Sequence, residues 1–152
     1  MEPRAILDEV ETAARAGDLT RALELAIQTL SADTGTLHLL GEDGALHLTA
    51  TGGGIPEPVQ AVIRTIPVGK GMAGLAVERA APVTACNIQT DDTGDVRPGA
   101  KATGLEGAIC VPVLRGDTPI GALGVANHAE RDFSADEENL LLDIGRALAP
   151  PA

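Results

Sequence analysis

The sequence predicts an α+β domain built on an antiparallel sheet, and three observations carry this prediction. Apolar residues recur at three- and four-residue spacing near both ends of the chain, a period typical of amphipathic helices. Two pairs of strand-like runs, at residues 34–51 and 107–127, are each divided by a short turn, which indicates two β-hairpins. Because hairpin strands run antiparallel, the order helices, hairpin, insertion, hairpin, helix favours this fold class.

Two helices open the chain. Residues 2–16 form the first, with an apolar stripe running from Ile6 to Ala14, and Gly17 ends it. Asp18 is expected to cap a second helix that reaches about residue 32. The apolar stripe of this second helix consists of Leu23, Ala26, Ile27 and Leu30.

The middle of the chain changes to a period of two residues. Residues 34–40 and 45–51 are predicted strands, separated by the turn Gly41-Glu42-Asp43-Gly44. After a run of three glycines, the pattern predicts in order a short helix at 56–62, an edge strand at 64–68, a helix at 71–80 and a short strand at 81–85. Pro67 restricts its strand to an edge, because its nitrogen cannot donate to a ladder.

The last third contains the longest loop and the most regular strands. Residues 86–105 form a polar loop of about 20 residues, and loops of that length are usually functional or disordered. The runs 107–114 and 118–127 are strands of the second hairpin. Ser134 and Glu137 form a capping box ahead of a final apolar helix.

Length and charge limit the possible functions. The 152 residues suit a single domain, 1–152, which buries roughly 70% of its unfolded surface. A net charge of −11 repels a phosphate-rich polymer, so nucleic acid is not an expected partner. No apolar run approaches 18 residues and no signal peptide is recognised, so we expect no membrane contact and a cytoplasmic location.

Phe133 is the only aromatic residue of the chain. The core must therefore be aliphatic, and a nucleobase or flavin would lack the rings on which such groups usually stack. Cys86 and Cys110 are the only cysteines, and in a reducing compartment they are expected to be free thiols. Because free cysteines are usually buried, inert packing is favoured over redox sensing.

The stretch VGKGMAGLAV, residues 68–77, has the Gly69-x-Gly71-x-x-Gly74 spacing of a dinucleotide-binding turn. Asp91 and Asp92 lie near the spacing of a ribose-binding carboxylate. A dinucleotide site requires a parallel strand and a long helix around its glycines, whereas this stretch follows a proline in a chain of hairpins. We therefore predict that Gly69 makes a turn and Gly74 permits close helix packing.

Three stretches give the chain a family resemblance. They are VGKGMAGLAVERAAPVTACNI at 68–88, GLEGAICVPVLRGDTPIGALGVAN at 104–127 and DFSADEENLLLDIGRALA at 132–149. Together they resemble a GAF domain over roughly residues 20–149. The resemblance implies a six-stranded antiparallel sheet, with terminal helices on one face and a ligand-sized pocket, covered by the loop 86–105, on the other. It also implies sensing of a small molecule, often by a dimer, and we expect residues 1–17 to pair with a second copy in a homodimer.

This resemblance makes the loop 86–105 and its neighbouring strands the candidate ligand site. Polar side chains there could direct hydrogen bonds at a small molecule. The candidate ligand-binding residues are Asn87, Thr90, Asp91, Asp92, Arg97, Lys101, Thr103, Cys110 and Asn127. Arg97 and Lys101 are the cations of the loop and the first candidates for contact with an anionic ligand. A solvated loop without a specific ligand stays the alternative, and the sequence identifies neither ligand nor cofactor.

The sequence matches three other kinds of site less well, namely a cyclic-nucleotide site, a metal site and a catalytic triad. Asn127, Phe133, Asp136 and Glu137 resemble part of a cyclic-nucleotide GAF signature, but His128 stands where that signature has Lys and the spacing is one residue shorter. The three histidines, His38, His47 and His128, lack the spacing of a metal site, so no metal is expected. No nucleophile elbow or tight Ser/His/Asp order predicts catalytic residues.

Free methionine-(R)-sulfoxide reductases resemble this chain in length and fold. Their reactive thiols and acids do not carry over, since Met72-Ala73 occupies the glycine-rich segment and Ala108 stands where that family has Glu. We therefore expect a stand-alone sensory or regulatory module, not an enzyme, that closes the loop 86–105 over a ligand and signals through its terminal helices or to a protein partner in trans. The alternatives are a thiol-dependent redox module or reductase-like enzyme, and a ligand-free interaction scaffold.

Overall fold

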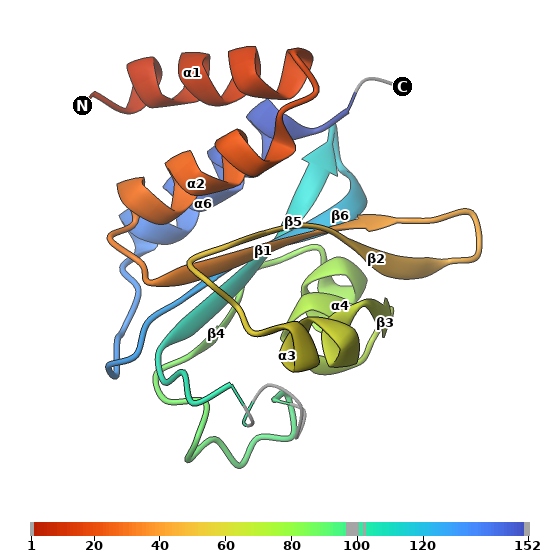
Figure 1. Ribbon diagram of the computed structural model, residues 1–152, viewed down its shortest axis with the longest axis vertical. Helices are drawn as coiled ribbons and strands as arrows, with labels where there is room; N and C mark the ends of the chain where they lie inside the picture. The colour runs from red at the N-terminus through yellow and green to blue at the C-terminus, as the bar shows by residue number, and fades with distance from the viewer. Residues whose placement is uncertain (1, 97–100, 102, 151–152) are drawn as a thin grey trace.

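The computed structural model describes residues 2–96, 101 and 103–150. Its centre is a six-stranded antiparallel sheet of order β3-β2-β1-β6-β5-β4 (Figure 1). The strands are β1 Thr34–Leu40, β2 Ala45–Gly52, β3 Thr65–Pro67, β4 Val83–Ala85, β5 Ala108–Arg115 and β6 Thr118–Ala126. The predicted fold class and both hairpins are confirmed, and β1 pairs with β6 at the centre of the sheet.

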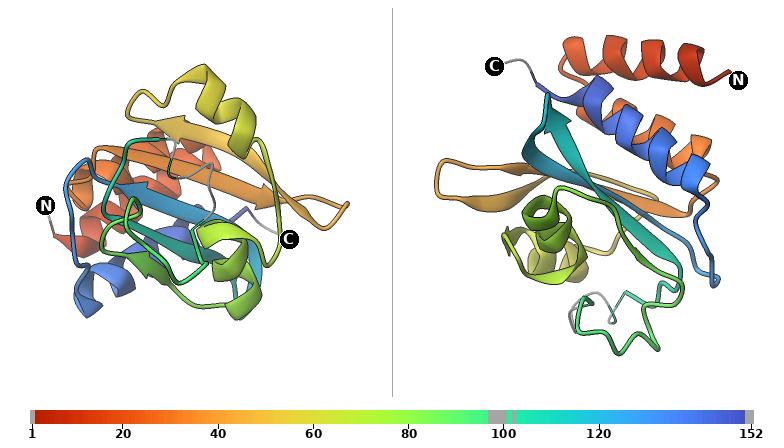
Figure 2. Two further views of the ribbon diagram at one scale, coloured as in Figure 1. Left: turned by 90° about the horizontal axis from the view of Figure 1, so that it is seen from below. Right: turned by 180° about the vertical axis from the view of Figure 1, so that it is seen from behind.

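The helices divide between the two faces of this sheet. They are α1 Pro3–Arg15, α2 Leu19–Thr29, α3 Glu57–Ile63, α4 Gly71–Arg79 and α6 Ala135–Leu148. Figures 1 and 2 show α2 and α6 against one face, α3 and α4 on the other, and α1 outside α2 and α6. The second helix ends earlier than the sequence predicts, because Ser31 adopts a left-handed φ of 53° and Ala32 N–H donates back to the Ile27 carbonyl.

The first helix uses its apolar stripe within its own chain. Ile6 and Val10 are buried in the core cluster that α2 and α6 share, and Leu7, Ala13 and Ala14 pack against it. The sequence predicts that residues 1–17, which carry this stripe, pair with a second copy of the chain. A homodimer would therefore have to use other surface, because the stripe already has a partner.

The two faces of the sheet differ in side-chain size. Leu37, Ile109, Val111 and Leu123 are fully buried beneath α2 and α6, where they form the main core. Alternation places the intervening residues of the same strands on the opposite face, and there Ala108, Gly124 and Ala126 are small. The small residues leave space between the sheet and the α3–α4 side.

The glycine-rich stretch adopts the packing role that the sequence predicts for it. Gly69 has a φ of 87° and makes the turn after β3, which pairs antiparallel with β2. At Gly74, inside α4, an added Cβ would lie 2.4 Å from the Pro67 carbonyl oxygen. The antiparallel sheet lacks the βαβ unit of a dinucleotide site, so these glycines serve a turn and a close helix approach.

Residues of the loop 86–105 that the structure describes are not uniformly solvated. Ile88, Val96 and Leu105 are buried in a cluster with Met72 and Ala126, beneath the polar residues of the loop. This apolar anchoring holds the loop against the small-residue face of the sheet. Among the described residues, no helix combines the length and apolar character needed to span a membrane.

Candidate functional site

A cavity of about 530 Å³ lies between the sheet and the α3–α4 side. Its floor is formed by β1, β5 and β6, and its walls by α3, the first turn of α4 and the loop residues Ile88, Thr103 and Leu105. Pockets that bind small molecules usually have volumes of 300–1,000 Å³ and mainly apolar linings with a few polar groups. Both the size and the apolar lining of this cavity fit that description.

The hydroxyl and imidazole groups of the floor come from one strand. Thr34, Thr36 and His38 follow one another at a spacing of two along β1 and all line the cavity. Leu37 points to the opposite face and is buried in the main core. These three residues are not among the sequence-predicted ligand residues, although their alternation with apolar neighbours in a predicted strand is a signal that identifies them.

His38 is the buried polar centre of this site. Its side chain is 2% exposed, and Nε2 lies 2.8 Å from the carbonyl oxygen of Ile63, the last residue of α3. A carbonyl can only accept, so Nε2 carries the proton and Nδ1 of the neutral ring is an acceptor. Within the described part of the chain, Nδ1 has no hydrogen-bond partner. A buried acceptor left without a partner destabilises a fold by about 1–3 kcal/mol.

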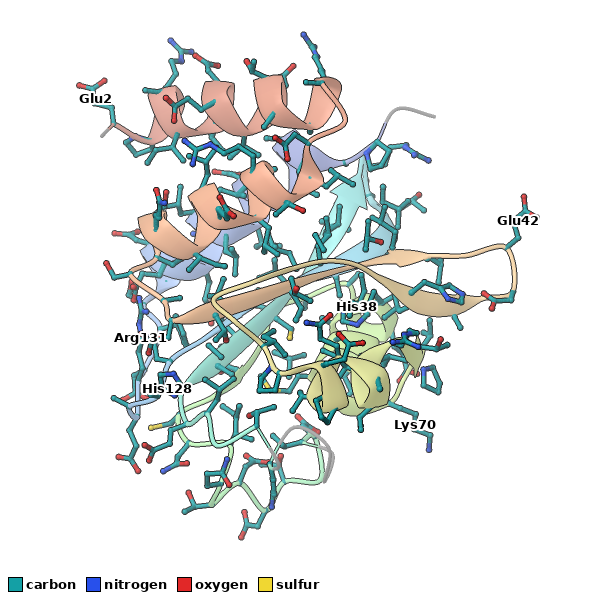
Figure 3. All side chains as sticks on the ribbon, viewed as in Figure 1. Glu2, His38, Glu42, Lys70, His128 and Arg131 are labelled. Atoms are coloured by element: carbon teal, nitrogen blue, oxygen red, sulfur yellow. The ribbon has the colours of Figure 1, made fainter. Side chains whose placement is uncertain are left out.

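The protonation state of His38 follows from its surroundings. Burial lowers the pKa of His38 below its ordinary value, the hydrogen bond to Ile63 opposes this shift, and the charge of His47 adds to it. The ring is therefore neutral at physiological pH. Figure 3 shows His38 between β1 and the α3–α4 pair, with Lys70 at the outer rim and its side chain extended away from the body.

Two of the sequence-predicted ligand residues, Thr103 and Cys110, line the cavity. The others that the structure describes lie outside its lining, and Arg97 falls outside the described residues. Thr90 and Asp92 are not part of the lining, and Lys101 Nζ donates to the Asp91 carbonyl at 3.1 Å. A role of these residues in ligand binding stays a prediction.

Asn87 and Asn127 hold segments together. Asn87 Nδ2 donates to Glu106 at 3.2 Å and to Glu130 at 2.8 Å, which ties the loop to the segment after β6. Asn127 Nδ2 donates to the Ser31 carbonyl at 3.0 Å, and its Oδ1 accepts from Arg131 at 2.9 Å. Both amides are therefore engaged within the protein.

Arg131 is a further structural residue that is not among the sequence-predicted candidates. Its guanidinium pairs with Glu137, the capping residue of α6, and stacks 4.4 Å from the ring centroid of Phe133. Its backbone N–H donates to the Cys86 carbonyl at 3.1 Å. Arg131 thus connects the start of the loop 86–105 with the start of α6. The partial cyclic-nucleotide signature of the sequence coincides here with a structural network.

Neither cysteine lies in an environment that favours its thiolate form. Cys86 is exposed, and a hydrogen bond to Asp132 raises its pKa. Cys110 lies on the cavity floor, where burial raises its pKa to about 12. The thiolate is the reactive form of cysteine, so both environments disfavour nucleophilic chemistry.

His38 and His47, the two histidines of the first hairpin, do not face each other. Across the ladder His47 faces Leu39, not His38, and its Nε2 lies 2.9 Å from the Asp43 carboxylate. In the part of the chain that the structure describes, no group of three His, Cys, Asp or Glu side chains could hold a metal ion.

Several solved structures of known proteins share this architecture. Among solved structures, the GAF domain of the phosphoenolpyruvate-protein phosphotransferase from Acinetobacter has a TM-score of 0.76 and 21% identity, covering 95% of this chain and 88% of its own. Free methionine-R-sulfoxide reductase from Neisseria meningitidis, in complex with its substrate, has a TM-score of 0.76 and 17% identity, with coverages of 96% and 85%. The type II enzyme from Thermoplasma acidophilum has a TM-score of 0.71 and 22% identity, covering 93% of each chain.

The fold and the cavity together define a class of protein. It is an α+β domain with terminal helices on one face of its sheet and a pocket on the other. The sequence model of the GAF domain family matches residues 19–150. The chain therefore belongs to the GAF domain family. The three likenesses above are all below 25% identity and show the shared fold. No match to a curated protein sequence was found.

Proposed function

We propose that this GAF domain is a sensory or regulatory module that binds a small molecule in the cavity over its sheet. The single observation that carries the proposal is the cavity itself, which combines about 530 Å³ of space with a mainly apolar lining and the buried polar group of His38. The size and lining favour a small molecule over a macromolecule as the occupant.

A path from the cavity to the terminal helices supports the regulatory part of the proposal. Ile88 and Leu105 line the cavity and belong to the loop 86–105. At the start of that loop, Cys86 accepts from Arg131, whose side chain pairs with Glu137 at the start of α6. A ligand that draws the loop inward would bear on α6 through these contacts, and it can shift the balance of two states only by its differential affinity for them.

A homodimer that pairs through terminal helices remains part of this proposal. It rests on the family and not on a spare face of α1, because Ile6 and Val10 are buried within the chain. In such an assembly, a shift of α6 would also reach α1, which packs against it in the same core cluster.

The thiol-dependent alternative has one observation in its favour, namely that Cys110 lies on the cavity floor. Two of the solved structures that share the fold are methionine sulfoxide reductases by name. The raised pKa of both cysteines opposes this alternative. We therefore propose a binding function, not an enzymatic one.

A thermal-shift screen against a panel of metabolites tests the binding proposal with a matched pair of variants. Val59 and Ala61 both lie on α3, but Val59 lines the cavity and Ala61 is exposed outside it. We expect at least one compound to raise the melting temperature of wild type and Ala61→Trp, and to have no effect on Val59→Trp, whose indole fills the cavity.

Two outcomes would contradict the proposal. Equal shifts in all three proteins would place binding elsewhere, and the absence of any shift would favour the interaction scaffold. Turnover of free methionine sulfoxide that is lost in Cys110→Ser or Cys86→Ser would instead establish the reductase.

A further inference from the structure

The charges around the cavity restrict what it can hold. Lys70 is the only Asp, Glu, Lys or Arg among the described residues of the lining, and its side chain extends away from the body (Figure 3). Because none of these lining residues is a carboxylate, a cationic ligand has no counter-charge there. The whole chain carries a net charge of −11, which repels an anionic one. These two facts together favour an uncharged ligand.

The shape and chemistry of the lining restrict the ligand further. The aromatic rings among the described lining residues are the imidazoles of His38 and His128, and the one Phe of the chain, Phe133, packs under Arg131 outside the cavity. A planar base therefore finds no Phe, Tyr or Trp ring on which to stack. The floor of Ala108, Gly124 and Ala126 instead suits a compact aliphatic body.

His38 Nδ1 is a buried polar atom of the lining that lacks a hydrogen-bond partner among the described residues. His38 Nε2 is held by the Ile63 carbonyl, so Nδ1 can only accept, and no group of the described residues donates to it. Buried polar atoms are almost always paired in folded proteins, so an orphan acceptor beside a cavity indicates a missing donor. The partner of Nδ1 must bring an O–H or N–H.

The wall of the cavity next to His38 is α3, a helix with little buried surface. None of the residues of α3 is buried, and Gly53 and Gly54, both with positive φ, precede the helix. The C-terminal end of α3 is anchored by the hydrogen bond from His38 to Ile63 and by that from the Leu48 N–H to the Arg64 carbonyl. Nδ1 is buried, so a donor reaches it only after neighbouring groups shift.

We propose that the ligand is an uncharged aliphatic molecule that carries a hydrogen-bond donor, such as an alcohol or an amide, and that His38 Nδ1 accepts this bond while Nε2 keeps its bond to the Ile63 carbonyl. This inference rests on the proposed binding function and adds to it the class of ligand and the residue that selects it. His38 thereby joins the ligand to the C-terminal end of α3 through its two ring nitrogens.

A matched pair of probes tests the inference. Cyclohexanol and cyclohexyl methyl ether share an aliphatic ring, and only the alcohol can donate a hydrogen bond. Each is titrated into the isotope-labelled full chain, and amide shifts of Val59 and Met72 report binding in the cavity. The ¹⁵N resonance of His38 Nδ1 reports the new hydrogen bond. For wild type we expect the alcohol to bind about 3- to 10-fold more tightly than the ether, the range that one net hydrogen bond supplies.

His38→Leu is the test variant, because the leucine side chain carries no hydrogen-bond acceptor in place of Nδ1. We expect this variant to bind both probes equally, with its amide spectrum otherwise retained. Equal affinities in wild type, or a preference for the alcohol that persists in His38→Leu, would overturn the inference and leave the cavity as a binding site. Failure of both probes to shift Val59 or Met72 would count against the proposed function itself.

Discussion

Gly74→Ala is expected to lower the free energy of unfolding by about 1–3 kcal/mol, the usual effect of adding a methyl group where there is no room. The new Cβ would lie 2.4 Å from the Pro67 carbonyl oxygen and 3.1 Å from the Gly69 nitrogen. Both are backbone atoms, which cannot rotate away. The gain in helix propensity of Ala over Gly opposes this loss, and it amounts to about 1 kcal/mol at most.

Gly145→Ala provides the control, because it makes the same change inside another helix. An added Cβ at Gly145 in α6 would meet its nearest atoms at 3.6 Å, an ordinary contact distance. This variant is expected to be more stable than wild type by about 0.5–1 kcal/mol. Urea denaturation of both variants measures the two changes. Equal effects at the two sites would show that Gly74 is not a close-approach position.

Arg131→Met is expected to lower the free energy of unfolding by about 1.5–3 kcal/mol, the range for hydrogen bonds to a charged group. The change leaves Asn127 Oδ1 and the Glu137 carboxylate without the guanidinium, in a site where the Arg131 side chain is only 19% exposed. It also removes the cation from the ring of Phe133.

Arg15→Met tests whether this effect belongs to the network of Arg131. Arg15 pairs with Glu11 on the surface of α1, with side chains 79% and 44% exposed. Such a pair contributes little in water, so a change within about 0.5 kcal/mol is expected. If the two Arg→Met variants unfold at the same denaturant concentration, Arg131 does not link the loop to α6.

The hairpins, the terminal helices and the role of the glycines could be predicted because their signals are local. Gly69 and Gly74 illustrate this, since the proline that precedes them and the hairpins around them are visible in the sequence and are incompatible with a βαβ unit. The capping box of Ser134 and Glu137 forms as predicted. The burial of Ile6 and Val10 could not be predicted in this way, because it depends on where α2 and α6 place their faces.

The site was harder to predict because its residues meet only in the folded chain. His38 gains its significance from the Ile63 carbonyl, 25 residues away, and from the absence of a donor to Nδ1 among the described residues. Polar loop residues such as Asn87 were selected for their chemistry, yet Asn87 bonds to Glu106 and Glu130 within the protein. Polarity alone does not distinguish a side chain that faces a ligand from one that holds a loop.

Native mass spectrometry of freshly purified protein tests the central claim, occupancy of the cavity by a small molecule, most directly. Wild type and Val59→Trp are compared after incubation with a metabolite extract of the cells that produced them. We predict a reproducible extra mass on wild type that is released on denaturation and is missing from Val59→Trp. The same extra mass on both proteins, or none on either, would contradict it.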